Sequence, residues 1–329
     1  MYFINNLYVI FRILAYNISI LKIEYLIWGI NMAKKNLNTL NNTPNILGLT
    51  FKQLRLAKGL TQKEVAGELS TTSLSHFENG KCIPHVDHFL KLLRNINVNT
   101  YEFQFLYNLN QRHSDVTVFD SRVSMAYYKR DVIQLKAILD EIINLEQDNP
   151  NIRHYKLEKI RVKAVISLLE PFEITTKEIN FLKNYLSEIK EWGQYDIKLF
   201  GQCSHLFDGY TLWDLTNNMI SPTQKSLKLQ YTRHALIDAV LNVISQLIHL
   251  KFYSLTTDFI TFLENINIDD RFLYEKITLV YDKAILQYVA GDVEAAKIIK
   301  KCKEDLVFYN CYDTVNLIQR DLDNLEINE

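Results

Sequence analysis

Along this chain, apolar residues recur every three or four positions, which is the spacing of amphipathic α-helices. The apolar segments are short between residues 48 and 108 and become longer from about residue 115 to the end. The 9 Gly and 5 Pro leave little material for the many tight turns of a β-sandwich or barrel. The pattern therefore predicts an all-α fold, with a domain of five short helices followed by a series of longer ones.

Capping residues indicate where the first three short helices begin or end. The first helix is expected over roughly 50–58. Thr61 starts the second, because Glu64 follows three residues later and completes a capping box. The third lies within STTSLSHFENG at 70–80, where Gly80 can adopt the left-handed conformation that ends a helix.

The fourth and fifth short helices are bounded in the same way. The fourth is expected after Pro84, and four apolar residues share one of its faces: Val86, Phe89, Leu90 and Leu93. Asn99 is expected to cap the fifth helix, with Glu102 at the third position. The five segments together predict a compact domain over 48–108.

The third helix carries polar side chains opposite its two apolar residues, Leu74 and Phe77. The polar positions are Thr72, Ser75, His76 and Asn79. Such short, uncharged side chains can approach the base edges and phosphates of DNA closely. The preceding segment has the small Ala66 where two steeply crossing helices nearly touch, and Gln62 at its start would lie over the phosphate backbone. The spacing predicts a helix-turn-helix whose second helix enters the major groove.

The remainder of the chain reads as a succession of amphipathic helices with brief joints. The expected helices cover 126–146, 152–170, 176–192, 226–250, 254–266, 271–290 and 293–310. Pro150, Pro171 and Pro222 fall at joints, where a missing N–H does least damage. Helices joined by short loops are antiparallel neighbours, and YVAGDVEAAKIIKKC at 288–302 resembles the small-residue crossing of a tetratricopeptide-like repeat. The prediction is an irregular α-solenoid of antiparallel helix pairs.

The charges add little to this picture. With 37 Lys and Arg against 38 Asp and Glu, the formal net charge is −1, so no chain-wide field attracts nucleic acid. Residues 48–108 hold seven basic and five acidic side chains, and Lys34 and Lys35 lie just upstream. This modest excess supports DNA binding only if it gathers on one face.

Residues with reactive or metal-binding side chains form no site that the sequence can reveal. The four cysteines, none of them in a C-x-x-C pair, are typical of reduced thiols in a cytoplasmic protein. The stretch CIPHVDH at 82–88 contains ligand types, but Pro84 and the helix start direct them apart, so no metal site is expected. Three other histidines are expected to be packing residues: His205, His234 and His249. The sequence contains no phosphate-binding glycine loop and no G-x-S-x-G elbow. We therefore expect that the protein is not an enzyme and binds no cofactor.

The first 31 residues require a separate interpretation. They are strongly apolar, but Arg12, Lys22 and Glu24 interrupt them, and the longest uncharged internal run, 13–21, is too short to span a bilayer. A Met at position 32 is followed by the polar, basic AKKNLNTLNN. We expect that the true start is Met32 and that 32–47 is a flexible basic arm; a membrane anchor at 1–31 is the alternative.

Two stretches resemble the phage-repressor, or XRE, type of helix-turn-helix: RLAKGLTQ at 55–62 and FENGK at 77–81. The resemblance implies that Arg55 pairs with Glu78 inside the domain. It also implies phosphate contacts from Gln62, Asn79 and Lys81, and base contacts from Thr71, Thr72 and His76. The full set expected on the DNA side is Gln62, Thr71, Thr72, Ser73, Ser75, His76, Asn79 and Lys81. The turn between Ala66 and Leu74 is about two residues shorter than the usual pattern, which makes the register of Thr71 and Thr72 less certain than that of His76.

The resemblance continues beyond this domain. The stretches at 59–81 and 88–103, and then EWGQYDIKLFGQCSHLFD at 191–208, are similar to the Rgg/GadR/MutR regulators of low-GC Gram-positive bacteria. This similarity covers about 48–325. It implies a homodimeric cytoplasmic transcription regulator of the quorum-sensing type that binds an inverted-repeat operator in double-stranded DNA. Residues 109–329 would form the tetratricopeptide-like domain for dimerisation and for sensing a short signalling peptide.

Four helix residues are candidates for holding such a peptide, because their side chains offer hydrogen bonds: Arg153, Tyr231, Arg233 and Asn242. An Asn side chain can donate and accept at once, as an extended peptide backbone requires. Ordinary surface or inter-helix hydrogen bonds are the alternative for each residue. Two other functions also remain open, namely a DNA-binding regulator that senses a protein partner, and an interaction scaffold that has lost DNA binding.

Overall fold

The computed structural model describes residues 46–110, 116–221, 229–266 and 268–324. These residues are predominantly helical and contain no strand, which confirms the all-α prediction over the part of the chain described. The chain divides into two compact units, one ending at Phe119 and one beginning at Asp120. The expectations for 1–31, and for the 32–47 arm up to residue 45, lie outside the described residues.

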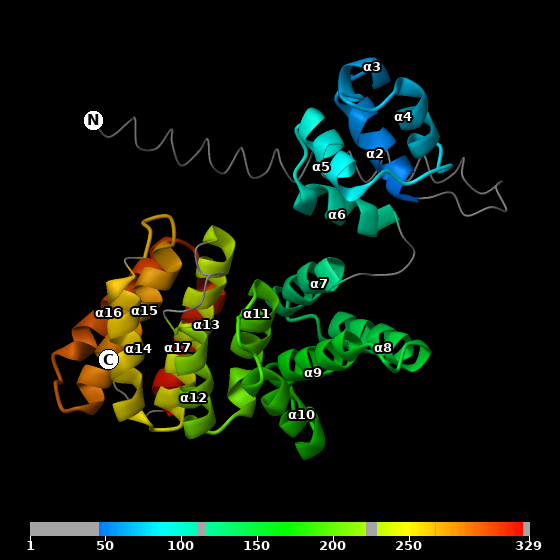
Figure 1. Ribbon diagram of the computed structural model, residues 1–329. Helices are drawn as coiled ribbons and strands as arrows, with labels where there is room; N and C mark the ends of the chain where they lie inside the picture. The colour runs from blue at the N-terminus through cyan, green and yellow to red at the C-terminus, as the bar shows by residue number, and fades with distance from the viewer. Residues whose placement is uncertain (1–45, 111–115, 222–228, 267, 325–329) are drawn as a thin grey trace, which may run out of the picture. The chain divides into compact units, whose positions relative to one another are not determined.

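The described residues of the first unit form five complete helices, followed by the first turn of α7 (Figure 1). They are α2 (Ile46–Ala57), α3 (Gln62–Val65), α4 (Thr71–Glu78), α5 (Val86–Asn95) and α6 (Thr100–Asn110). The first begins at Ile46, ahead of the expected residue 50, so 46 and 47 belong to this helix and not to a flexible arm. The reason is burial, because the turn that starts α2 packs its backbone against α4 at Gly48.

The predicted helix caps of the first unit are confirmed. The Glu64 amide donates to the Thr61 hydroxyl at 3.3 Å, and the Thr61 amide donates to the Glu64 carboxylate at 2.6 Å. The amide of Glu102 donates to the Asn99 side chain at 2.8 Å. Each of these bonds involves an amide at a helix start that has no partner within its own helix.

Apolar side chains of all five helices form the core of the first unit. Its fully buried members include Phe51, Val65, Leu74, Phe77, Leu92, Leu93, Ile96 and Phe103. The predicted buried face of α5 is partly wrong, because Val86 and Leu90 are exposed and Leu92 is buried instead. The face that packs runs through Phe89, Leu92 and Ile96, since α6 covers that side, where the Phe89 and Phe103 rings meet edge to face at 4.9 Å.

The contact between α2 and α4 is close enough to require a glycine. A Cβ atom added at Gly48 would lie 1.8 Å from the carbonyl oxygen of Phe77. Real side chains never approach a backbone oxygen so closely, so the two helices could not keep their spacing with any other residue. This close approach fixes the position of α4 against α2.

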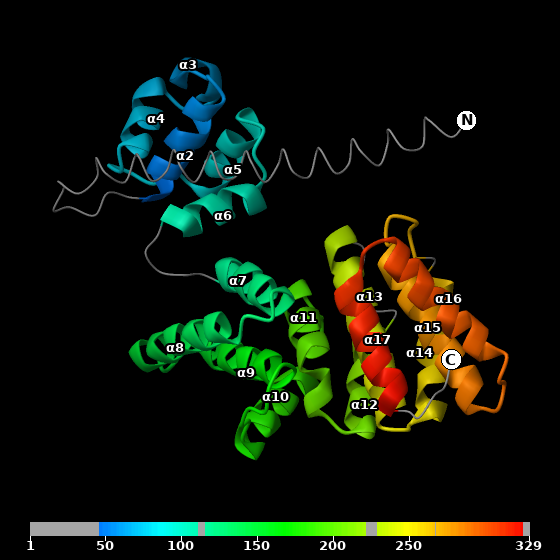
Figure 2. The same cartoon turned by 180° about the vertical axis from the view of Figure 1, so that it is seen from behind.

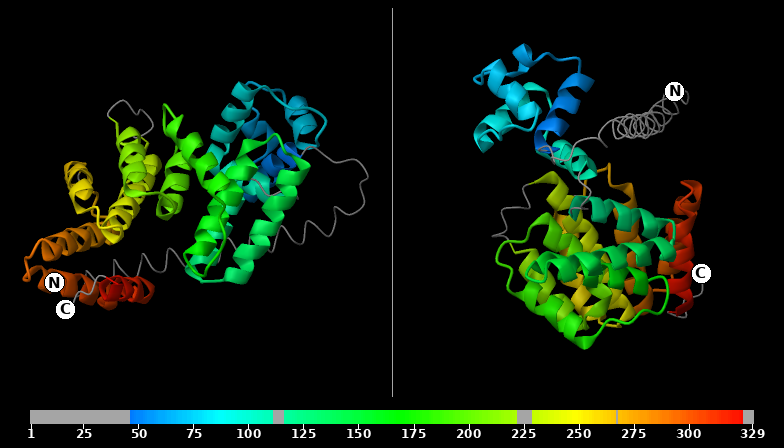
Figure 3. Two further views of the ribbon diagram at one scale, coloured as in Figure 1. Left: turned by 90° about the horizontal axis from the view of Figure 1, so that it is seen from below. Right: turned by 90° about the vertical axis from the view of Figure 1, so that its right-hand side faces the viewer.

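The second unit is a series of helices that stack in chain order from α8 to α16 (Figures 1, 2 and 3). In chain order the helices are α7 (Val116–Tyr128), α8 (Val132–Asp148), α9 (Arg153–Ser167), α10 (Thr176–Ser187), α11 (Gln194–Cys203), the short η1 (Ser204–Leu206), α12 (Gly209–Met219), α13 (Gln230–His249), α14 (Tyr253–Asn265), α15 (Leu273–Val289), α16 (Ala295–Phe308) and α17 (Tyr312–Asn324). Successive helices joined by short turns, such as α8 with α9 and α15 with α16, pack against each other.

Some helix assignments differ from the sequence-based ones. The expected helix over 126–146 is broken into α7 and α8, because Arg130 adopts a left-handed conformation with φ 52° and Asp131 starts a new helix by accepting the Gln134 amide at 2.9 Å. Helices α11, α12 and α17 were not expected. All three have only a few apolar residues three or four positions apart, which is a short and easily missed helical signal.

The long helix α13 lies at the centre of the second unit. It packs against α11, α12, α14 and α15, and α11 in turn packs against α9. Eleven of its residues are buried, including Val240, Val243, Ile244 and Leu247. The helices α9, α11, α13 and α15 therefore contact one another in sequence and form a layer on which α8, α10, α12, α14 and α16 pack. Within the described residues, no helix has the length and apolar character needed to cross a membrane.

Candidate nucleic-acid interface and sensor face

The helix α4 presents its polar side away from the core of the first unit. Leu74 and Phe77 are 0% and 1% exposed, so they fix the orientation of this helix. The candidate base-contacting residues lie on the accessible side: Thr71, Thr72, Ser73 and His76 are exposed, and Ser75 is half-buried. Ser70 caps the helix by accepting the Ser73 amide at 3.0 Å, which gives the hydroxyl-rich first turn a defined start.

A buried carboxylate links α4 to the two helices before it. The Arg55 guanidinium donates two hydrogen bonds to Glu78, from Nε at 2.6 Å and from Nη2 at 2.8 Å, and both residues are buried. The hydrogen bond to Glu78 raises the pKa of Arg55 above its ordinary value. The Gln62 amide donates to the same carboxylate at 2.8 Å. Arg55, Gln62 and Glu78 thus connect α2, α3 and α4 through one network.

This network determines what Gln62 can offer to a ligand. A side-chain amide carries two N–H groups, and Glu78 accepts from only one of them. The second N–H is therefore held in a defined direction at the start of α3. The resemblance to phage repressors implied the Arg55–Glu78 pair, but it did not imply that Gln62 joins it.

Basic and amide side chains gather at the carboxyl end of α4. The Asn79 amide donates to the Ser75 carbonyl at 2.9 Å, and its side-chain oxygen accepts from Lys52 at 3.2 Å. Lys81 is exposed two residues further on. The sequence analysis counted Lys52 only as part of the local charge and did not select it, because no local pattern relates α2 to the end of α4. This end of the helix offers ammonium and amide donors of the kind that bind phosphate.

The other charges of the first unit are partly neutralised. Lys91 pairs with Glu68 at 2.5 Å, and Arg55 is used internally by Glu78. Lys52, Lys63 and Lys81 have no acidic partner among the described residues. Lys52 and Lys81 lie at the end of α4, whereas Lys63 on α3 is followed by the exposed Glu64. Chemically, the surface combines hydroxyl, imidazole and amide groups with unneutralised lysines at its edge.

In the second unit, the four candidate peptide-contacting residues do not lie together. Arg153 is exposed at the start of α9, with its guanidinium 5.8 Å from the centre of the Tyr185 ring. Arg233 donates to the Ile266 carbonyl at the end of α14. Asn242 donates to the Gly201 carbonyl of α11 at 3.4 Å. Because Arg233 and Asn242 are nine positions apart in one helix, they project in opposite directions.

Tyr231 and Asn242 do share a face of α13. At about 100° per residue, four exposed positions of this helix fall within about 40° of one another. These positions are Tyr231, Asp238, Asn242 and His249. We call this open stripe, defined by these four residues, the α13 face.

Polar contacts also join neighbouring helices of the second unit. Arg161 of α9 donates to Gln202 of α11 at 3.0 Å. Ser245 of α13 donates to Asp282 of α15 at 3.4 Å. The sequence analysis missed Arg161, which is buried against Glu158, because an internal ion pair between positions three apart resembles an ordinary helix-surface pair.

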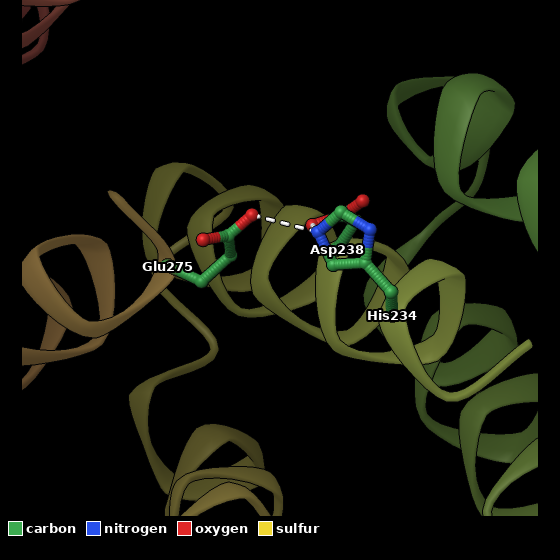
Figure 4. Close-up of side chains that lie close together, drawn as sticks. All are labelled: His234, Asp238 and Glu275. Carbon is green, nitrogen blue, oxygen red and sulfur yellow. Dashed lines mark hydrogen bonds and ion pairs between the residues drawn. The ribbon is translucent and has the colours of Figure 1, made fainter. Parts of the chain in front are cut away.

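His234, which the sequence analysis expected to be a packing residue, packs its ring but also faces two carboxylates. Its Nε2 atom lies 2.8 Å from a Glu275 carboxylate oxygen of α15 and 3.7 Å from an Asp238 oxygen one turn along α13 (Figure 4). Its ring stacks on Phe272 with centroids 4.3 Å apart and an interplanar angle of 11°. Partial burial raises the pKa of the Asp238 carboxyl to about 6, while the neighbouring His234 acts to lower it. No local sequence pattern links positions 234 and 275.

A domain with an exposed polar helix in the second position of a helix-turn-helix, followed by stacked helical pairs, defines a class of DNA-binding regulators. Comparison with protein families gives the same class. A model described as the C-terminal domain of the HTH-type transcriptional regulator Rgg matches residues 139–319. A helix-turn-helix model matches residues 51–103. Since the first match alone covers more than half of the chain, the chain belongs to the Rgg family of helix-turn-helix transcriptional regulators.

Solved structures show the same fold. The SHP pheromone receptor Rgg2 of Streptococcus dysgalactiae is 23% identical, with a TM-score of 0.66 over 83% of this chain and 97% of that chain. A regulator from Listeria monocytogenes EGD-e is 20% identical, with a TM-score of 0.67 over 86% and 99% of the two chains. PrgX, solved as a complex with cCF10, is 14% identical, with a TM-score of 0.62 over 85% and 99%.

Proposed function

We propose that this Rgg-family regulator binds a specific operator through α4 and that a short peptide bound to its helical-repeat unit controls this binding. The observation that carries the DNA-binding part is the orientation of α4. Its apolar pair is fully buried, and its exposed threonine and imidazole side chains face away from the core, where base edges can reach them. No charged side chain within α4 points outward, because its one acid, Glu78, is buried.

In this proposal, base contacts come from Thr71, Thr72, Ser73, Ser75 and His76. Phosphate contacts come from the second N–H of Gln62, from Asn79 and Lys81, and from Lys52, which already lies beside Asn79. Phosphate contacts fix the register of the helix on the duplex, and base contacts select the sequence. An imidazole can hydrogen-bond a base edge as donor or as acceptor, so His76 supplies discrimination that the hydroxyls alone do not.

The proposed active form is a cytoplasmic homodimer. A two-fold axis would place one α4 in each of two major grooves about one helical turn apart, roughly 34 Å. The operator would then be an inverted repeat. Dimerisation belongs to the helical-repeat unit in this proposal, because one short helix-turn-helix offers too few contacts for tight binding by itself.

Peptide control is proposed for the α13 face. Asn242 lies in the middle of this open stripe and already bonds a backbone carbonyl, that of Gly201. The same amide could hold an extended peptide backbone, as Asn does when it donates and accepts together. Support also comes from the structural neighbours, of which one is a pheromone receptor and another was solved with cCF10. Of the four candidates, Tyr231 and Asn242 fit this site, whereas Arg153 and Arg233 lie elsewhere.

The test is whether short peptides encoded beside the gene change operator affinity. We expect a labelled peptide to bind the full chain, and operator affinity to shift at least about 5-fold when it does. Asn242→Ala should weaken peptide binding about 10-fold, since one backbone-directed pair is lost. The matched control is Asn180→Ala, which replaces an exposed asparagine of α10 and should leave peptide affinity unchanged.

The outcomes separate the proposal from its two alternatives. If no peptide binds and a protein from the same cell shifts operator affinity, the helical repeats sense a protein partner. If no duplex is selected from a random pool by the free or the peptide-bound protein, the chain is an interaction scaffold. If Asn242→Ala and Asn180→Ala weaken peptide binding equally, the α13 face is not the peptide site. The proposal that α4 binds DNA would not be affected by this result.

A further inference from the structure

We propose that His234, Asp238 and Glu275 form a binding site for one divalent transition-metal ion, of which Zn²⁺ is the best fit. The three side chains offer one imidazole nitrogen and two carboxylate oxygens, all within 4.8 Å of one another. The two helices that provide them, α13 and α15, are neighbours in the layer of packed helices. The ion would therefore join two successive repeats.

The first element of the site is the spacing along α13. His234 and Asp238 are four positions apart, so they lie on the same side of the helix, one turn from each other. This is the spacing by which a single helix supplies two ligands to zinc in proteins. Figure 4 shows His234 and Asp238 close together, with His234 joined to Glu275, which comes from the first turn of α15.

The distances are compatible with a metal ion as well as with a simple ion pair. In a tetrahedral zinc site with metal–ligand bonds of about 2.0–2.2 Å, two ligand atoms lie about 3.3 Å apart. The His234 nitrogen is 2.8 Å from Glu275 and 3.7 Å from Asp238, so the observed distances lie on both sides of that value. Because all three ligand atoms lie within 4.8 Å of one another, side-chain rotations that draw the two carboxylates closer would bring them to coordination distance.

The ligands are also held in position before any ion binds. The His234 ring is stacked on Phe272, which restricts its rotation. Glu275 is buried, whereas the Asp238 side chain is 49% exposed. The site thus has one firmly placed ligand on the inner side and an opening to solvent through which an ion can enter.

The donor set indicates which ions fit. Calcium and magnesium prefer sites made of oxygen alone, whereas imidazole with carboxylates suits zinc and its first-row neighbours. Three protein ligands leave a fourth position for water. Two carboxylates and one neutral histidine would carry a formal charge of −2, which a divalent ion neutralises.

Binding an ion at this place would stabilise the packing of α13 on α15. Asp238 belongs to the α13 face, so the ion would also alter the charge beside the proposed peptide-contacting residue Asn242. The metal site itself does not depend on the peptide proposal, because its ligands and its test involve no peptide.

The test is calorimetric titration of the purified full chain, freed of metal, with ZnCl₂ alone. We expect one ion per chain, a higher melting temperature with Zn²⁺, and visible Co²⁺ absorption of the tetrahedral type when Co²⁺ replaces it. Asp238→Asn should weaken binding at least about 10-fold and abolish the thermal shift, and Glu275→Gln should do the same. The controls are His249→Gln, which changes another histidine of α13, and Cys82→Ser, which removes the exposed thiol.

Unchanged affinity and stoichiometry in Asp238→Asn would overturn the proposal. So would loss of Zn²⁺ binding in Cys82→Ser or His249→Gln, which would assign the ion to another place. Asp238 is half exposed, so its variant keeps the fold even if replacement of the buried Glu275 does not. If the circular dichroism spectrum shows that Glu275→Gln is unfolded, the result for Asp238→Asn decides alone.

Discussion

At the scale of single residues, Glu78 has the largest structural role in the first unit. It is fully buried, it accepts two hydrogen bonds from Arg55, and it accepts a third from Gln62. The resemblance of 55–62 and 77–81 to phage repressors was enough to predict the first pair. The bond from Gln62 to Glu78 could not be predicted, because it depends on the directions of the two side chains, which the spacing of residues does not determine. The same limit applies to Lys52, which reaches Asn79 from another helix.

We expect Glu78→Ala to destabilise the first unit strongly. Removing one partner of a buried ion pair leaves the other charge unpaired, which costs about 3–5 kcal/mol. The measurement is hydrogen exchange followed by mass spectrometry on peptides from 46–110, where protection should fall by two or more orders of magnitude. The control is Glu68→Ala, whose exposed pair with Lys91 contributes less than about 1 kcal/mol. Equal protection in the two variants would show that the network does not hold the domain together.

At the scale of elements, the periodic pattern predicted most helices and failed at specific residues. The break between α7 and α8 depends on a left-handed Arg130, and arginine is not a residue type that marks such turns. The buried side of α5 was only partly predicted: Phe89 and Leu93 pack as expected, but Leu92 is buried in place of Val86 and Leu90. The close approach of Gly48 to Phe77 carried no signal, because a glycine near the expected start of a helix is ordinary.

A contact between α9 and α10 predicts that the stability of the second unit depends on pH. Lys163 of α9 donates to Glu178 of α10 at 2.7 Å, and Thr175 donates to the same carboxylate from its amide at 2.9 Å. Burial alone would raise the pKa of Glu178, but the hydrogen bonds from Lys163 and Thr175 outweigh burial and lower it below the ordinary 4.5. The ionised form is therefore favoured by folding. Its contribution is complete above about pH 4.5 and is lost as the pH falls through the lower pKa of the folded state.

We expect Glu178→Gln to reduce the free energy of unfolding by about 1–2 kcal/mol at pH 7. The difference from the unchanged protein should shrink below pH 4.5 as both come to carry a neutral side chain. Urea unfolding followed by tryptophan fluorescence, to which the buried Trp192 contributes, measures this at several pH values. Glu188→Gln, on an exposed side chain, is the control and should cost little at any pH. A difference that stays constant from pH 7 to pH 3 would contradict the assignment.

At the scale of the whole molecule, the order of a helix-turn-helix unit and a helical-repeat unit was predictable from the sequence. Two features made it so, namely the change in segment length after residue 108 and the resemblance to Rgg regulators. The face of α4 was predictable because its two apolar residues, Leu74 and Phe77, lie three positions apart and the polar residues fall on the other side. The side-chain contacts of the second unit were not predictable, because they join residues far apart in the sequence. His234 and Glu275 are 41 residues apart, and Ser245 and Asp282 are 37 apart.

The central claim, that α4 reads base edges, has consequences for the whole protein on DNA. Lys81 is assigned to phosphates, so Lys81→Ala should weaken binding to all duplexes about equally and reduce the dependence of affinity on salt by about one phosphate contact. His76 is assigned to a base, so His76→Ala should relax selection at one base pair and cost about 1–3 kcal/mol there. The two variants thus have different signatures.

The most direct measurement is selection of binding sites from a pool of random duplexes by the purified full chain and by its His76→Ala variant. The account predicts that the unchanged protein enriches an inverted repeat and that the variant enriches the same repeat with no preference at one position of each half-site. An identical enriched sequence for both proteins, or enrichment of none by either one, would contradict it.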